Sequence, residues 1–187
     1  MIVYTFTNSP YKAYVSGFTI DYQTRFWYLP APFDGMVFGV NYSHMTSIAT
    51  YPYLFVRNIP NPNNPKLAST ELVDSTVSGR LVDQPNDLLN AYIGYDYRGF
   101  SARLSFLFQG NSVSYIGGQP EQDGFTTNYF RIDAQVRQLL PWTGLQLFLN
   151  AQNLNNEANI STQSSINGFT SEDYYGMTID LGIRYIL

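Results

Sequence analysis

The sequence predicts an all-β protein, an antiparallel up-and-down meander of about seven long strands. Apolar and polar residues alternate with a period of two over seven segments, which is the pattern of a strand with one buried and one wet face. The connections between these segments alternate between short turns and long polar stretches. Charged residues make up only 13% of the 187 residues, about half the usual share, while aromatic residues make up 17%. A sheet with one apolar and one polar face accounts for all three observations.

Each of the seven segments is justified by the apolar positions that recur at every second residue. In chain order these positions are Phe18, Ile20, Tyr22 and Phe26; Met36, Phe38, Val40 and Tyr42; Leu89, Ala91, Ile93, Tyr95 and Tyr97; Phe100, Ala102, Leu104, Phe106 and Phe108; Phe130, Ile132, Ala134 and Val136; Leu145, Leu147, Leu149 and Ala151; and Tyr175, Met177, Ile179, Leu181, Ile183, Tyr185 and Leu187. Residues 2–7 are predicted to be the end of another strand.

The charged residues of these segments fall on the opposite parity. They are Asp21, Arg25, Asp96, Arg103, Arg131, Asp133, Arg137, Asp180 and Arg184. Lysine is almost absent from the segments. The sequence therefore predicts one polar, ionised wall on the face opposite the apolar one.

The connections predict which ends of the strands are neighbours. Residues 29–35, the dipeptide Arg98-Gly99 and residues 140–144 are short and rich in Pro and Gly, as tight turns are. Residues 54–79, 117–126 and 155–171 are long and rich in Asn, Ser, Thr and Pro, and we expect loops there. Transmembrane β-barrels have this asymmetry, with short periplasmic turns and long extracellular loops.

Two architectures compete for this pattern, a soluble β-sandwich and a membrane barrel. The apolar faces run for four to six alternate positions, which covers most of an apolar band of about 25 Å. Aromatic residues gather at both ends of those faces, for example Tyr97 and Phe100 near a short turn and Phe108 and Phe130 near a long connection. Rings at both membrane interfaces are typical of barrels, and we favour the barrel.

Composition excludes several other classes. The chain has no cysteine, so disulfide scaffolds and thiolate metal sites are excluded. Ten Lys and Arg face fourteen Asp and Glu, a balance that argues against a nucleic-acid partner. No apolar run approaches the roughly 18 residues of a membrane-spanning helix. The first residues lack the basic and apolar regions of a signal peptide, so an exported protein would carry further sequence upstream.

Catalytic and metal-binding motifs are weak. His44 is the only histidine and is expected at the surface or rim rather than in a catalytic triad. Asp83, Asp87, Glu121 and Asp123 are expected to be turn residues, although an oxygen-only calcium site in the loops stays open. The sequence therefore predicts no enzyme, no bound metal and no cofactor.

One ion pair follows from the shortest turn. If Arg98-Gly99 is a two-residue hairpin loop, Asp96 faces Ser101 and lies diagonal to Arg103. We expect a cross-strand ion pair between Asp96 and Arg103. Such a pair would line the polar wall, with direct substrate contact as the second interpretation.

Several blocks of the sequence, in this order and spacing, resemble the late strands of the TonB-dependent outer-membrane receptor family. These blocks include Gly17-Phe18-Thr19-Ile20-Asp21-Tyr22-Gln23, Phe26-Trp27-Tyr28-Leu29-Pro30-Ala31-Pro32, Gly79-Arg80-Leu81-Val82-Asp83-Gln84-Pro85, Asn150-Ala151-Gln152-Asn153-Leu154 and Asp180-Leu181-Gly182-Ile183-Arg184-Tyr185. The resemblance covers nearly the whole chain.

The resemblance implies that residues 1–187 are the C-terminal third of a 22-stranded barrel, open as an isolated chain. It also implies an integral protein of a Gram-negative outer membrane that imports a scarce ligand, such as a siderophore, cobalamin, a glycan or a peptide. The implied partners are outer-membrane lipid, the plug domain and remaining strands that this chain lacks, TonB acting only through that plug, and the barrel-assembly machinery. The implied C-terminal assembly signal comprises Asp180, Gly182 and Tyr185, with Leu187 in place of the usual final aromatic residue.

Two alternatives remain from other classes. A passive porin or small structural barrel would share the strands and lack the plug. A soluble glycan-binding β-sandwich would share the alternation and need no membrane.

Overall fold

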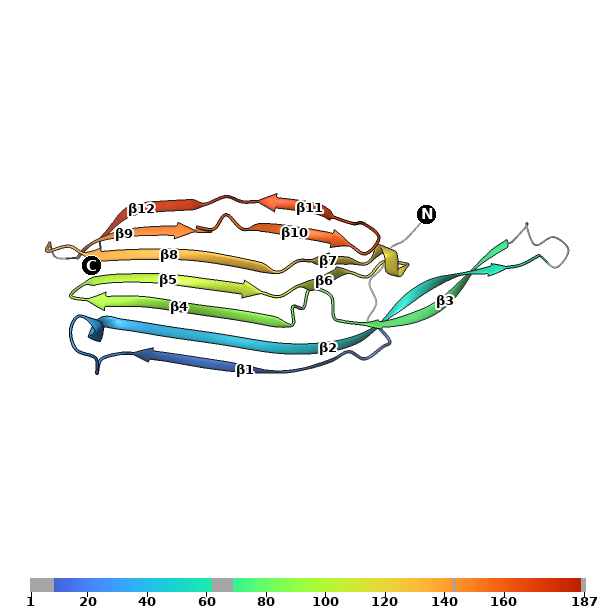
Figure 1. Cartoon of the computed structure of the whole chain (residues 1–187), viewed down its shortest axis with the longest axis horizontal. Helices are drawn as coiled ribbons and strands as arrows, with labels where there is room; N and C mark the ends of the chain where they lie inside the picture. Colours follow the sequence, from blue (N-terminus) through green and yellow to red (C-terminus); the bar gives the residue numbers. More distant parts are fainter. Residues whose placement is uncertain (1–8, 62–68, 143, 186–187) are drawn as a thin grey trace.

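The computed structural model describes residues 9–61, 69–142 and 144–185 and is an all-β protein. Seven long strands form an antiparallel meander in the order β1-β2-β4-β5-β8-β9-β12 (Figure 1). Their bounds are Tyr14–Arg25 for β1, Met36–Ile59 for β2, Asp87–Tyr97 for β4, Phe100–Gln109 for β5, Tyr129–Leu139 for β8, Leu145–Gln152 for β9 and Thr178–Tyr185 for β12. The predicted meander of about seven strands is confirmed, and the sheet is open at β1 and β12.

The strand register confirms that the apolar positions share one face. One row across the sheet joins Phe38 to Ile93, Ile93 to Leu104, and Leu104 to Ala134. Further rows run from Val136 through Leu149 to Leu181 and from Phe18 to His44. Because side chains alternate between faces, one consistent register carries the alternation of each strand across all seven. We call this surface the apolar face and the opposite one the polar face.

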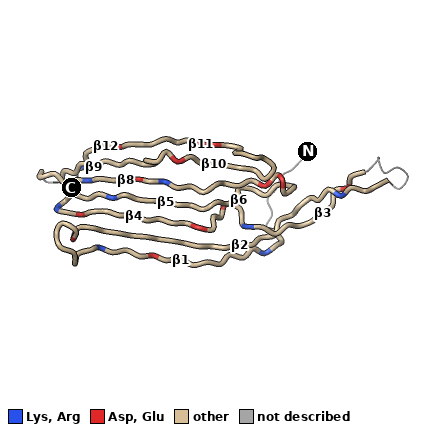
Figure 2. The backbone as a smooth tube through the Cα atoms, viewed as in Figure 1, with Lys and Arg blue, Asp and Glu red and all other residues tan. Residues whose placement is uncertain are grey.

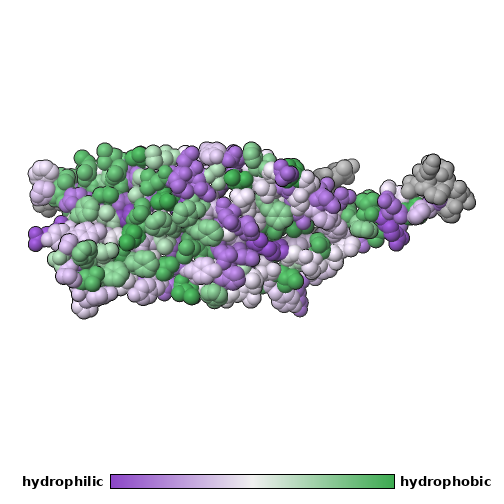
Figure 3. All heavy atoms as spheres, viewed as in Figure 1, coloured by the Kyte–Doolittle hydropathy of each residue, from purple (hydrophilic) through white to green (hydrophobic). Residues whose placement is uncertain are grey.

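The apolar face is uncovered. Leu181 and Ile183 are 72% and 67% exposed, and no large side chain in the described ranges is fully buried. In Figure 3, hydrophobic atoms gather over the left half of the view, where the short turns join the strands. A β-sandwich buries such a face against a second sheet, whereas this sheet is a single layer.

The long connections contain strands that the sequence did not predict. β6 (Ser112–Tyr115), β7 (Gly124–Thr126), β10 (Ala158–Gln163) and β11 (Phe169–Tyr174) form a second antiparallel sheet in the order β11-β10-β7-β6. This outer sheet repeats the order of β12, β9, β8 and β5 and extends it end to end (Figure 1). Within the predicted loops at 117–126 and 155–171, residues 124–126, 158–163 and 169–171 are therefore corrected to strand. The other residues of these two ranges form connecting segments as predicted, one of them the 3-10 turn η2 (Pro120–Gln122).

The expected loop at 54–79 is likewise a hairpin. β2 continues to Ile59 and pairs with β3 (Ser69–Gly79) in eleven residue pairs, so a two-stranded ribbon projects from the sheet (Figure 1). The Tyr51 hydroxyl donates a hydrogen bond to the Arg80 carbonyl oxygen at 2.9 Å and anchors the base of the ribbon.

The ends of the predicted strands need smaller corrections. β1 ends at Arg25, so Phe26 lies outside it, and Tyr175 and Met177 precede β12. Residues 29–35 form the expected turn and contain the 3-10 turn η1 (Phe33–Gly35). The predicted strand end at 2–7 and Leu187 lie outside the described residues. Among the residues that are described, no helix is long and apolar enough to cross a bilayer.

Candidate functional site

The polar face holds all nine charged residues that the sequence assigned to a wall. Strand register places Asp96, Ser101 and Arg137 in one row across the sheet. The next row contains Arg25, Arg103 and Asp180. The remaining four members occupy the same face as follows: Asp21 and Arg131 lie toward the outer sheet, Asp133 faces Ser105, and Arg184 faces Gln146. Most of the basic residues of the meander lie toward the short turns (Figure 2).

The predicted ion pair between Asp96 and Arg103 is present. Two guanidinium nitrogens of Arg103 donate to the two carboxylate oxygens of Asp96 at 3.0 and 2.7 Å. Arg98 and Gly99 both have positive φ, 44° and 83°, which is the backbone of a type I′ hairpin turn. This turn fixes the register that sets Asp96 opposite Ser101, so Arg103 lies on the diagonal and reaches it with a bidentate geometry.

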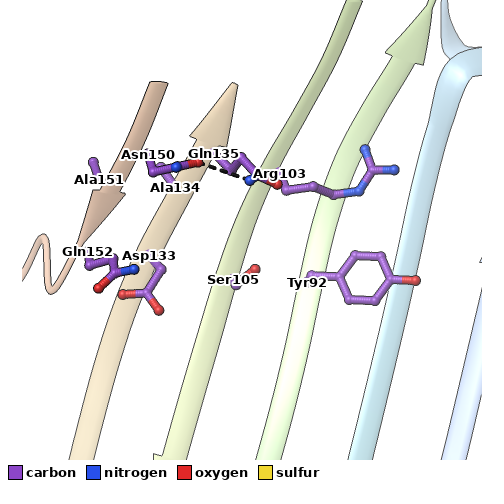
Figure 4. A pocket seen from close by; sticks show the side chains of 9 residues that line it. All are labelled: Tyr92, Arg103, Ser105, Asp133, Ala134, Gln135, Asn150, Ala151 and Gln152. Atoms are coloured by element: carbon purple, nitrogen blue, oxygen red, sulfur yellow. Dashed lines mark hydrogen bonds between the residues drawn. The ribbon is translucent and has the colours of Figure 1, made fainter. Parts of the chain in front are cut away.

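A hollow of about 410 Å³ lies at the centre of the polar face (Figure 4). Its polar lining comprises Tyr92, Arg103, Ser105, Asp133, Gln135, Asn150 and Gln152. The Gln135 side chain donates to Asn150 Oδ1 at 2.9 Å, and Arg131 pairs with Asp133 at 3.0 Å. The lining offers donors and acceptors together, which suits a polar ligand or a polar protein surface. The sequence did not single out the uncharged residues of this lining as site residues. The available signal was that they stand at every second position along the strands, in step with the charged residues.

Glycines shape the polar face by making room for long neighbours. A Cβ built on Gly39 would lie 2.3 Å from the Tyr92 ring, and one on Gly182 would lie 2.5 Å from the Phe148 ring. A Cβ on Gly94 would lie 2.5 Å from the Arg103 side chain and 2.6 Å from the Ala102 carbonyl oxygen. Each long side chain therefore lies flat across a glycine of the next strand, which keeps the space above the sheet open.

The charged residues at the two edges have different surroundings. Asp21 accepts a hydrogen bond from the Asn41 side chain at 3.1 Å. The Arg184 guanidinium lies 5.4 Å from the centre of the Phe148 ring, close enough for a cation–π contact. Asp180, Gly182 and Tyr185 of the predicted assembly signal all lie in β12, and among the described residues β12 pairs with β9 alone.

His44 and the turn carboxylates lie in separate hydrogen-bonded surroundings. His44 Nδ1 lies 2.8 Å from Asp87 Oδ1, which also accepts a hydrogen bond from the Tyr42 hydroxyl at 2.7 Å. Asp83 has a positive φ of 59°, and Asp123 accepts a hydrogen bond from the Gly117 backbone, as residues of turns do. Within the described ranges no group of three or more His, Asp and Glu could hold a metal ion.

Beyond the last backbone pair between β8 and β9, side chains accept the hydrogen bonds of the β8 backbone N–H groups. The Asn155 side-chain oxygen accepts from the Ile132 backbone N–H at 3.0 Å, and Glu157 Oε1 accepts from the Phe130 N–H at 3.2 Å. Asn153, which is 7% exposed and has a φ of 56°, accepts from the Glu157 N–H at 2.8 Å and donates to the Gly176 carbonyl at 3.0 Å. This cluster joins the meander to the outer sheet.

The outer sheet carries one perturbed phenol. The Tyr174 hydroxyl donates to Glu172 at 2.8 Å, and this hydrogen bond to a carboxylate raises the pKa of Tyr174 above its ordinary value. The negative charge of Glu172 acts in the same direction. Tyr174 therefore stays protonated and serves as a donor on the rim of this sheet.

Comparison with known proteins gives no relative: no family model, no curated protein and no solved structure matches the chain.

Proposed function

We propose that the chain forms the C-terminal part of the wall of an outer-membrane β-barrel that imports a ligand in the manner of TonB-dependent receptors. The observation that carries the proposal is the pair of faces: an exposed apolar face across seven strands lies opposite a face with paired charges. Lipid on one side and a wet interior on the other provide a favourable environment for both faces.

The dimensions of the apolar face support this proposal. On β5 the apolar positions run from Phe100 to Phe108, and at about 3.4 Å per residue this distance is about 27 Å along the strand. With the usual tilt of about 35–45°, the strand spans roughly 19–22 Å across a membrane. That height covers most of the apolar band of a typical barrel, which is about 25 Å.

Strand direction indicates how such a barrel would close. Successive strands of the seven-stranded meander are antiparallel, so β1 and β12 run in the same direction. Closure by antiparallel pairing alone therefore needs an odd number of further strands between them. The 22-stranded barrel of the resembled family meets that condition.

The import function rests on the resemblance and on the hollow polar face. In this proposal the polar face lines the interior against a plug domain, the outer sheet and the ribbon of β2 and β3 meet the ligand outside, and the short turns face the periplasm. The protein is a transporter and not an enzyme. The ligand belongs to a class that is scarce outside the cell, such as a siderophore, cobalamin, a glycan or a peptide.

Two arginine substitutions test the membrane assignment. They change adjacent residues of β5 whose side chains lie on opposite faces of the sheet. Leu104→Arg places a cation on the apolar face and is expected to cost about 2–4 kcal/mol of folding free energy in a bilayer. Ser105→Arg places the same cation on the polar face beside Asp133 and is expected to cost little. Refolding of the protein into lipid vesicles, followed by urea titration, measures both. Equal losses for the two variants would reject the assignment of the faces.

The import mechanism is tested separately in cells. Uptake through a TonB-dependent receptor stops when TonB is deleted or the proton gradient is dissipated. Accumulation of a labelled candidate ligand by cells carrying the protein is expected to show that dependence. Uptake unchanged by TonB deletion would indicate a passive porin.

A further inference from the structure

A second hollow of the polar face lies beside the β4–β5 turn and is strongly basic. Its volume is about 290 Å³. We call it the basic pocket, and its polar and charged lining comprises Arg25, Asp96, Arg98, Ser101, Arg137 and Gln146. Three cations and one carboxylate give this lining a net positive charge, although the whole chain has a net charge of −4.

The single carboxylate of the basic pocket already has a partner. Both oxygens of Asp96 accept hydrogen bonds from Arg103, which lies outside the pocket lining. Within the described residues, the side chains of Arg25 and Arg137 make no hydrogen bond and no ion pair, although the charge of Arg137 is near enough to act on Asp96. Two guanidinium groups therefore face the pocket with all their donors unused.

The Gln146 side chain is a further donor that lines the pocket. Its amide makes no hydrogen bond in the part of the chain that the structure describes, and its nitrogen and oxygen stay accessible to solvent. A ligand with acceptor atoms can therefore accept a hydrogen bond from this amide.

One row of residues forms part of the pocket lining. Asp96, Ser101 and Arg137 lie side by side in strand register, and the small Ser101 between the two charged residues accepts a hydrogen bond from Arg103 Nη1 at 3.4 Å. Arg137 therefore borders the pocket on one side of Ser101, and the paired Asp96 borders it on the other. The Arg98 guanidinium also lines the pocket and lies over the Tyr97 ring, 5.1 Å from its centre.

We propose that the basic pocket binds an oxyanion, a carboxylate or phosphate group, held by Arg25 and Arg137 with the Gln146 amide as an additional donor. Planar guanidinium groups form paired, charge-assisted hydrogen bonds with such groups. The anion is either a free ion or a carboxylate of a polypeptide segment that lies against the polar face. The inference rests on the proposed function only for its location, which is the periplasmic end of the barrel interior.

Inorganic phosphate and arginine side-chain NMR distinguish these sources. The protein in detergent micelles, with ¹⁵N-labelled arginine, is titrated with phosphate at constant ionic strength. For a free ion, the Nε–H signals of Arg25 and Arg137 shift in a saturable way, and Arg137→Gln weakens the apparent affinity about tenfold or more. Arg57 is the control, because it is exposed on the ribbon and already pairs with Glu71 at 3.2 Å. Equal, unsaturable shifts at Arg57 would indicate a general salt effect and overturn the free-ion arm.

A polypeptide carboxylate gives a different result. Phosphate then leaves the arginine signals unchanged. Arg25→Gln and Arg137→Gln instead lower the melting temperature of the complete protein in low salt, and this decrease in melting temperature is smaller in high salt. Arg57→Gln is the matched control and leaves the melting temperature unchanged. A protein that shows neither a saturable phosphate response nor a salt-dependent loss of stability has no oxyanion site in this pocket. Neither readout depends on ligand uptake, so the pocket and the import proposal can fail separately.

Discussion

At the scale of single residues, the polar face is built from pairs of one long side chain and one glycine. Tyr92 lies over Gly39, Arg103 over Gly94, and Phe148 over Gly182 in the neighbouring strand. Side chains that lie flat keep the space above the polar face open, whereas side chains that stand upright would fill it. The glycines thus act through close approach and not through backbone freedom.

This arrangement predicts that the methyl group of alanine is harmful at Gly94. Its Cβ would meet the Ala102 carbonyl oxygen at 2.6 Å and the Arg103 side chain at 2.5 Å, so both strands would have to shift. We expect Gly94→Ala to lower the free energy of unfolding by about 1–3 kcal/mol, the usual cost of overpacking. Gly79→Ala is the matched control because a Cβ there meets no atom within 4 Å. Urea titration in micelles measures both, and equal stability of the two variants would contradict the role of close approach.

The Asp96–Arg103 pair could be predicted from the sequence, whereas the glycine contacts could not. The pair follows from a two-residue turn, which fixes register and therefore the diagonal neighbour. The glycine contacts depend on which rotamer a side chain adopts across the strand boundary, and no local pattern encodes that choice.

At the scale of elements, the sequence predicts the seven strands of the meander and misses the strands beyond it. Alternation is a local signal and is strong where one face is apolar, as it is between Phe100 and Phe108. The outer strands lack that contrast: β11 reads Phe-Thr-Ser-Glu-Asp-Tyr and is exposed throughout. Such strands form because the meander already holds their neighbours at pairing distance, a long-range cause that periodicity does not report.

The segment between β9 and β10 joins the two sheets through side chains, and Asn153 is its buried centre. Asn153→Ala removes an acceptor for the Glu157 N–H and a donor to the Gly176 carbonyl, and it leaves alanine at a φ of 56°. We expect a loss of about 1–3 kcal/mol in unfolding free energy, from unpaired buried groups and backbone strain.

Two further variants separate these causes. Asn153→Gly accommodates the positive φ and loses only the hydrogen bonds, so it is expected to fall between the wild type and Asn153→Ala. Asn58→Ala changes an exposed asparagine of the ribbon that lies in an ordinary strand, and it is expected to be neutral. Hydrogen exchange of the Glu157 amide reports the local effect directly. Protection of this amide that is unchanged in Asn153→Ala would rule out the side-chain bridge.

At the scale of the whole molecule, one layer of sheet carries three regions with different surroundings. The meander has an apolar and a polar face, the outer sheet is mostly polar with β11 exposed throughout, and the ribbon of β2 and β3 projects from the meander (Figure 1). The ribbon of β2 and β3 and the two hairpins of the outer sheet, β6–β7 and β10–β11, all extend from the same end of the meander. The short turns lie at the other end. In a barrel wall this asymmetry assigns the two ends to opposite sides of the membrane.

The last prediction tests that assignment with single cysteines, since the chain has none of its own. Ser75→Cys lies on the ribbon and Ser171→Cys on the outer sheet, and both positions are exposed. Trp142→Cys lies in the short turn between β8 and β9 and is likewise exposed. A membrane-impermeant maleimide added to intact cells is expected to label the first two positions, because the extensions face outward, and to label Trp142→Cys only after the outer membrane is permeabilised. Equal labelling of all three in permeabilised cells controls for reactivity. The reverse pattern would place the short turns outside, which would invert the barrel and remove ligand capture from the ribbon and the outer sheet.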